Sequence, residues 1–209
     1  MGVRAALDIL ALLVASGYCT IPLFWLMVHP FMERWRKRGR RAYGIIVPAW
    51  GGIIVITFLI MWPFRSAHFY TTWFAWAPAA MFFLLGFSIY RAAFQSFHHT
   101  QVSGLAEIEP GRHRQHLVTI GIRSRVRHPI YLGHLCEIVG WCVGTGLIAL
   151  YVLAVFAVVT GAAMIRMEDR ELEARFGEAY REYRTRVPAV VFRFKSSQPR
   201  ITADPADKS

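Results

Sequence analysis

The residues best suited to chemistry lie in two polar stretches, one covering residues 115–133 and one that begins at Glu168. In the first, Arg127 and His128 come directly before Pro129, which is favoured at the first position of an α-helix because its missing N–H would be unpaired there. Free backbone N–H groups and the positive end of the helix dipole meet at such a start. Together with two cationic side chains they suit an anionic group such as a carboxylate. The alternative is that Arg127 and His128 only cap a membrane helix.

The second stretch predicts a charged helix over residues 168–186. Apolar and aromatic residues recur there at i, i+4, i+8 and i+11, which is one face of a helix: Leu172, Phe176, Tyr180 and Tyr183. Glu168 lies on the same face one turn earlier, so it is predicted to point toward the pocket of His128. The alternative is an interfacial amphipathic helix with acidic residues at its start, where the helix dipole favours them.

The composition is that of a membrane protein. Of 209 residues, 55% are hydrophobic, and the mean hydropathy of +0.35 is too high for a typical soluble domain. The net charge is +11 and the isoelectric point about 10.2. Because the basic residues lie between and after the apolar runs, the positive-inside rule accounts for them, and no nucleic-acid partner is expected.

Five apolar runs are predicted to be transmembrane helices, since a span needs about 20 apolar residues: 5–28, 45–62, 73–90, 130–143 and 147–165. The first is expected to be a retained span, because its apolar core is longer than that of a signal peptide and no clear cleavage site follows. The last two form a helical hairpin with a turn at 144–146. The Gly51-Gly52 pair in the second run predicts close helix packing.

The charge distribution predicts the orientation. Residues 33–41 carry six basic residues, and the arginine-rich segment 91–127 follows the third span, so both are expected in the cytoplasm. The loop at 63–72 has little charge and several aromatic residues, as at an outer interface. The N-terminus is therefore expected outside and the C-terminus in the cytoplasm of a prokaryotic inner membrane. Three regions are predicted: a three-span region (1–90), a core (91–190) and a disordered tail (191–209).

Metal and nucleotide-binding motifs are not found in the sequence. Cys19, Cys136 and Cys142 lie in apolar segments without a C-x-x-C pair, so they are expected to be packing residues. No metal is expected, because the spacing follows no ligand pattern among His98, His99, His113 and His116. Neither G-x-G-x-x-G nor a P-loop occurs, and the polar segments are too short for a Rossmann unit. Any cofactor is therefore expected at the membrane surface.

Taken in order, several short runs resemble a known family. They are Leu117-Val118-Thr119-x-Gly121, Arg127-His128-Pro129-x-Tyr131-x-Gly133, Glu168-Asp169-Arg170-x-Leu172, Phe176-Gly177-x-x-Tyr180-x-x-Tyr183 and Val187-Pro188. This pattern resembles the isoprenylcysteine carboxyl methyltransferases and related phospholipid methyltransferases, over roughly residues 85–190. The resemblance implies an all-α integral membrane methyltransferase that binds S-adenosylmethionine on the cytoplasmic side without a Rossmann domain.

The resemblance also implies the site. The expected cofactor-binding residues are Gln115, His116, Leu117, Val118, Arg123, Arg127, His128, Pro129, Ile130, Tyr131 and Glu168, with Glu168 and His128 as catalytic residues. The cofactor carboxylate would suit the helix start at Pro129. Glu168 would suit the amino group or the positive sulfonium. Tyr131 and the Leu117-Val118 pair could pack on the adenine.

Three positions depart from the family pattern. Asp169 replaces the second glutamate of a Glu-Glu pair, and Gln115 stands where the family has a histidine, with His116 following. Met164 replaces an arginine associated with the prenylcysteine substrate, and Arg166 would face elsewhere on a helix. These departures bear on the prenylcysteine carboxylate more than on the cofactor.

The identity of the methyl acceptor stays open at this point. A lipid, a small thiol, a prenyl-type carboxylate and an amine headgroup are all candidates. A thiol or an amine must lose a proton, for which Glu168, His128 and His134 are the candidate bases. Two other functions are also open: an NADPH-dependent membrane reductase of the sterol-reductase type, and a non-enzymatic membrane protein.

Overall fold

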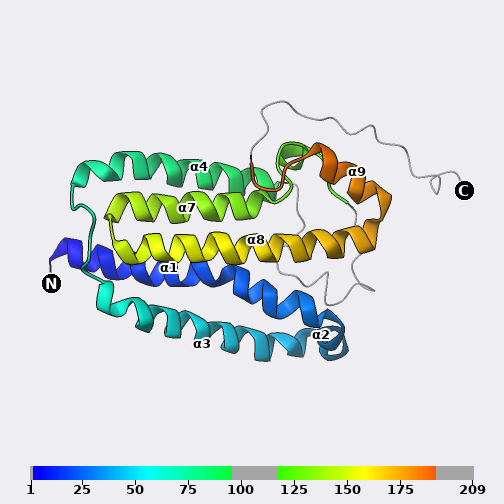
Figure 1. The fold of residues 1–209 in the computed structure, drawn as a ribbon, viewed down its shortest axis with the longest axis horizontal. Coiled ribbons are helices and arrows are strands. Elements are labelled where there is room, and N and C mark those ends of the chain that lie inside the picture. Colours follow the sequence, from blue (N-terminus) through cyan, green and yellow to red (C-terminus); the bar gives the residue numbers. More distant parts are fainter. Residues whose placement is uncertain (1, 96–116, 192–209) are drawn as a thin grey trace, which may run out of the picture.

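Long apolar runs form the helices, because in lipid each backbone N–H and C=O must find its partner within the helix. The computed structural model describes residues 2–95 and 117–191, and Figure 1 shows them as a bundle of long helices lying side by side. The helices are α1 Val3–Val28, α2 Met32–Arg38, α3 Tyr43–Met61, α4 Trp76–Phe94, α7 Pro129–Thr145, α8 Ile148–Phe176 and α9 Glu178–Arg186. Short 3-10 turns join them at His29–Phe31, Gly39–Ala42, Trp62–Phe64, Trp73–Ala75 and Gly121–Ser124. Over the described residues, strand-type pairing is limited to one isolated bridge between His68 and Leu147.

Three helical segments are long and apolar enough to cross a membrane: Val3–Phe64, Trp73–Phe94 and Ile148–Phe176. The first contains both α1 and α3, which run side by side and reverse direction at α2 (Figure 1). The remaining bundle helix, α7, has 17 residues. These lengths and compositions are those of an integral membrane protein.

Helix α7 lies at the centre of the bundle and contacts α4, α8 and α1. Buried side chains from three helices meet there, among them Leu12 of α1, Ile138 of α7 and Leu153 of α8. The three cysteines are buried and unbridged, as expected of packing residues. This packing fixes the position of α7, whose first turn carries the Arg127-His128-Pro129 motif.

Glycines let α7 approach α4 closely. A Cβ added at each of three α7 glycines would lie 2.7 to 2.8 Å from an aromatic ring carbon of α4, in the pairs Gly133–Tyr90, Gly140–Phe83 and Gly144–Trp76. The aromatic rings therefore occupy the space that a side chain would fill, as in small-residue helix contacts of membrane proteins. The structure makes no such contact at the Gly51-Gly52 pair, where no atom lies within 4 Å of a Cβ at either position.

The hairpin turn between α7 and α8 is held by the loop before α4. Gly146 has φ +67°, which ends α7, and its carbonyl accepts a hydrogen bond from the N–H of Phe69 (2.9 Å). The N–H of Ile148 donates to the carbonyl of Ala67 (2.8 Å), and His68 Nε2 lies 3.1 Å from Asp8 Oδ2. These contacts join three helices at this end of the bundle.

The C-terminal helix differs from the expected single helix over 168–186. Helix α8 runs without a break from the apolar segment through Glu168 to Phe176, and Gly177, with φ +57°, then turns the chain into α9. Glycine tolerates this positive φ. Tyr180 and Tyr183 fold back on Leu172 and Phe176, so the predicted apolar face survives as a cluster contributed by two helices. Residues 192–209, predicted to be disordered, lie outside the described residues.

Candidate active site

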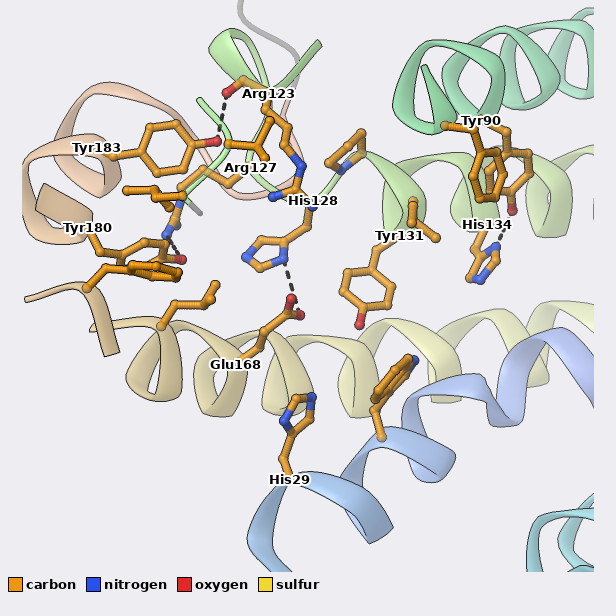
Figure 2. A pocket seen from close by; sticks show the side chains of 18 of the residues that line it. His29, Tyr90, Arg123, Arg127, His128, Tyr131, His134, Glu168, Tyr180 and Tyr183 are labelled. Carbon is orange, nitrogen blue, oxygen red and sulfur yellow. Dashed lines mark hydrogen bonds and ion pairs between the residues drawn. The ribbon is translucent and has the colours of Figure 1, made fainter. Parts of the chain in front are cut away.

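A cavity of about 760 Å³ opens at the end of the bundle where α2 and α9 lie. This volume lies within the roughly 300–1,000 Å³ typical of sites for small molecules. Its walls come from α1 and the turn after it, from α4, α7, α8 and α9, and from the segment that leads into α7. Figure 2 shows the polar side chains of these elements turned toward one another.

The structure gathers nine of the eleven sequence-predicted binding residues around this cavity. They are Leu117, Val118, Arg123, Arg127, His128, Pro129, Ile130, Tyr131 and Glu168. The other two, Gln115 and His116, lie outside the described residues, as do His98, His99 and His113. Within residues 2–95 and 117–191, no group of three His, Cys, Asp or Glu side chains could hold a metal ion.

The start of α7 forms as its proline predicts. Pro129 is the first helical residue, and the side chain of His128, the N-cap residue, makes no capping hydrogen bond. The backbone N–H groups of Arg127 and His128 instead donate to the carbonyls of Pro188 and Ala189, each at 2.9 Å. The segment after α9 thus fixes the backbone of both residues at the start of α7.

Two neighbouring carboxylates of α8 hold His128. Its Nδ1 lies 3.3 Å from Glu168 Oε2, and its Nε2 lies 3.0 Å from Asp169 Oδ1 (Figure 2 labels His128 and Glu168). The same Asp169 oxygen accepts a hydrogen bond from Arg127 Nη1 at 2.8 Å and another from the hydroxyl of Tyr180. One buried carboxylate therefore links three elements of the site.

The environment favours a charged His128. Burial by itself lowers the pKa of this imidazole, but Glu168 and Asp169 outweigh burial, so the pKa lies above its ordinary value. The hydroxyl of Tyr183 donates to the carbonyl of Arg123 at 2.7 Å, and burial raises its pKa to about 12. The two carboxylates thus favour the imidazolium form of His128, beside a phenol that is neutral at neutral pH.

The contribution of α1 was missed from the sequence. Tyr18, Trp25 and His29 line the cavity, and His29 Nδ1 lies 2.6 Å from Glu171 Oε2 of α8. The ring of Trp25 stacks on that of His29 with centroids 5.4 Å apart. The spacings of seven and four residues place all three on one helix face, and this signal was available in the sequence.

The structure also shows where two other residues discussed in the sequence analysis lie. Asp169 appeared in the Glu-Asp-Arg run without a role, and the structure places it at the centre of the ion-pair cluster. Met164, which stands where the family has a substrate-associated arginine, is fully buried and does not line the cavity.

The sequence of this chain matches a known family. Residues 73–179, just over half of the chain, match the phospholipid methyltransferase family, and the chain belongs to that family. It is also similar to methanethiol S-methyltransferase 2 of Bradyrhizobium diazoefficiens, with 33% identity over 176 residues. The aligned region covers 84% of this chain and 56% of that relative, so the chain spans little more than half of the relative's length. No solved structure matches the chain.

Proposed function

We propose that this protein is an S-adenosylmethionine-dependent membrane methyltransferase that acts on a lipidic or small hydrophobic acceptor. The observation that carries the proposal is the cavity itself. It brings together an uncapped helix start, cationic side chains and a buried carboxylate from distant parts of the sequence. The cofactor has the complementary groups, namely a carboxylate, an amino group and a positive sulfonium. The relative's name supports a thiol among the candidate acceptors.

The residues at the site fit this cofactor. Glu168 Oε2 is buried and accepts no hydrogen bond of normal geometry, although it lies 3.3 Å from His128 Nδ1. A buried acceptor of this kind favours a positively charged ligand group. Pro129 and Ile130 at the start of α7 line the same cavity, and the start of a helix suits a carboxylate.

S-adenosylmethionine supplies an activated methyl group when it is bound. Arg123 and the first turn of α7 would hold its carboxylate, and Glu168 would hold its amino group. Leu117, Val118 and Tyr131 would pack on the adenine. His128 keeps the Glu168 carboxylate in place, and the aromatic walls exclude water, so the chain's task is to orient the reactants.

The membrane arrangement is part of the proposal. Helices α1, α3, α4, α7 and α8 would be five spans, with the N-terminus outside and the C-terminus in the cytoplasm. The cavity would then open at the cytoplasmic face of a prokaryotic inner membrane, with α9 as an amphipathic helix at that surface. Support comes from the basic residues of α2 and from the charged end of α8, which lie at the same end of the bundle (Figure 1). Residues 1–90 would form the membrane region and 91–190 the methyltransferase core.

Ligand-induced thermal stabilisation tests the proposal. A ligand at a hundredfold excess over Kd stabilises the folded state by about 2.7 kcal/mol. We expect S-adenosylmethionine and S-adenosylhomocysteine to raise the melting temperature of the protein in detergent. This ligand-induced rise should shrink in Glu168→Gln and persist in the control Glu178→Gln, an exposed glutamate of α9. Stabilisation by NADPH alone would instead support the reductase, and no stabilisation by any of these compounds would refute the proposal.

A further inference from the structure

The cavity continues along α7 beyond the residues assigned to the cofactor. His134 lies six residues after His128, roughly 9 Å further along the helix axis at a rise of about 1.5 Å per residue. Tyr18 of α1 and Tyr90 of α4 line the cavity at this depth together with His134. These three residues, which we call the Tyr18–Tyr90–His134 cluster, come from three different helices.

The cluster is held by ring contacts and one hydrogen bond. The centroid of the His134 ring lies 5.3 Å from that of Tyr18 and 5.4 Å from that of Tyr90, both in edge geometry. The hydroxyl of Tyr90 is hydrogen-bonded to Nδ1 of His134, and Figure 2 shows the two side chains facing each other. The other ring nitrogen of His134, Nε2, is therefore the one that can contact a ligand in the cavity.

The charges around the cavity argue against a cationic acceptor. Among the described lining residues, four are arginines and one is a carboxylic acid: Arg91, Arg123, Arg127, Arg175 and Glu168. The single carboxylate, Glu168, is assigned above to the amino group of the cofactor. Glu137, the acidic residue of α7, does not line the cavity, although its charge acts on Tyr18 and Tyr90. An ammonium headgroup would thus meet an excess of positive charge among the lining side chains and no lining carboxylate that the cofactor leaves free.

The walls of the cluster suit a small sulfur compound. Phenol and imidazole rings surround the space, and Phe87 extends the apolar wall. Sulfur makes favourable contacts with aromatic ring edges at about 5 Å. A thiol S–H is a weak hydrogen-bond donor, and the unprotonated nitrogen of a neutral imidazole can accept its hydrogen bond.

Resting on the methyltransferase function proposed above, we infer that the Tyr18–Tyr90–His134 cluster is the acceptor subsite and that it takes a small alkanethiol. The thiol sulfur forms a bond to the methyl carbon while the bond between that carbon and the sulfonium sulfur breaks. The thiol proton passes to Nε2 of His134 in the tautomer whose Nδ1–H donates to the oxygen of Tyr90. The products are a thioether and S-adenosylhomocysteine.

Methyl-transfer kinetics on the purified full chain test the subsite, with ethanethiol and vesicle-borne phosphatidylethanolamine as alternative acceptors. We expect the protein to methylate ethanethiol, and we expect no methylation of phosphatidylethanolamine. Tyr90→Phe removes one hydrogen bond and should raise KM for ethanethiol roughly fivefold. His134→Gln should lower kcat about 100-fold, the usual size of a general-base contribution. Both variants should keep the melting-temperature rise given by S-adenosylhomocysteine.

A matched control comes from the far end of the bundle. The hydroxyl of Tyr70 donates to the carbonyl of Val143 at 2.8 Å, and Tyr70 does not line the cavity, so Tyr70→Phe should leave the ethanethiol kinetics unchanged. Native kinetics in both cluster variants, with the response to S-adenosylhomocysteine intact, would overturn the subsite and leave the methyltransferase standing. Methylation of phosphatidylethanolamine in place of ethanethiol would overturn the acceptor class. A native protein that S-adenosylhomocysteine does not stabilise would overturn the proposed function and the subsite with it.

Discussion

Asp169 is the residue on which the geometry of the site most depends. One of its oxygens contacts Arg127, His128 and Tyr180, and only 6% of its side chain is exposed. The partners come from the segment before α7, some 40 residues earlier in the chain, and from α9, which folds back on α8 after Gly177. A single carboxylate therefore sets how α7, α8 and α9 meet around the cavity.

Replacing Asp169 should destabilise the protein strongly. Asp169→Asn leaves the Arg127 guanidinium, which is 8% exposed, without its counter-charge. Breaking a buried pair in this way costs about 3 to 5 kcal/mol. The exposed pair between Glu182 and Arg186 provides the control, since Glu182→Gln should cost less than about 1 kcal/mol. Equal melting temperatures of the two variants in detergent would contradict the central role of Asp169.

The raised pKa of His128 predicts a pH dependence of stability. A histidine whose pKa is higher in the folded than in the unfolded state contributes stability below its unfolded pKa of about 6.5, and this stability is lost as pH rises through the folded pKa. The free energy of unfolding should therefore fall as pH rises above about 6.5. Melting temperatures of the native chain and of His128→Gln measure the effect. The fall of the melting temperature with rising pH should be smaller in His128→Gln than in the native chain, whatever the overall stability of the variant. An equal fall in both proteins would refute the raised pKa of His128.

The sequence predicted much of the site at the residue scale. Pro129 marked the helix start, and the motifs on either side named most of the residues that line the cavity. It missed the role of Asp169, because ion pairs between distant segments depend on tertiary packing. The ion pair of His29 was missed for the same reason, since its partner Glu171 lies 142 residues away along the chain, although the spacing of His29 from Trp25 already indicated their shared helix face.

At the scale of helices, the close contact between α4 and α7 can be tested by adding a methyl group where the two helices touch. A Cβ at Gly140 would lie 2.8 Å from Phe83 Cε1, so Gly140→Ala forces the ring or the helix to move, at a cost of about 1 to 3 kcal/mol. Gly52→Ala adds the same methyl group to α3 where nothing lies within 4 Å, and its stability should stay at or slightly above that of the native chain. Denaturation in detergent compares the two, and a costlier Gly52→Ala would contradict the packing.

The apolar runs predicted the membrane helices well. The periodic pattern of the C-terminal segment did not predict the break at Gly177. The ends of α3, α7 and the start of α8 fall within two residues of the predicted runs, because polar residues, proline and glycine mark them. The i, i+4, i+8, i+11 pattern continues through Gly177, so the sequence read as one helix. Only tertiary contacts of Tyr180 and Tyr183 show that the chain turns there.

At the scale of the whole molecule, the proposed orientation predicts which loops can be labelled from outside the cell. Single cysteines at exposed positions, Ser66→Cys before α4 and Lys37→Cys in α2, report on opposite ends of the bundle. The native cysteines are buried and provide a low background. A membrane-impermeant thiol reagent should label Ser66→Cys in intact cells and Lys37→Cys only after permeabilisation. The reverse pattern would invert the orientation.

The hydrogen bonds from Arg127 and His128 to the carbonyls of Pro188 and Ala189 also set an order of events during synthesis. Helices α1, α3, α4 and α7 lie well before Pro188 in the chain, so they can leave the ribosome before these carbonyls do. The motif at the start of α7 is made some 60 residues earlier but lacks its backbone partners until then. A growing chain thus holds four of its long helices before the segment that positions Arg127 and His128 has been released.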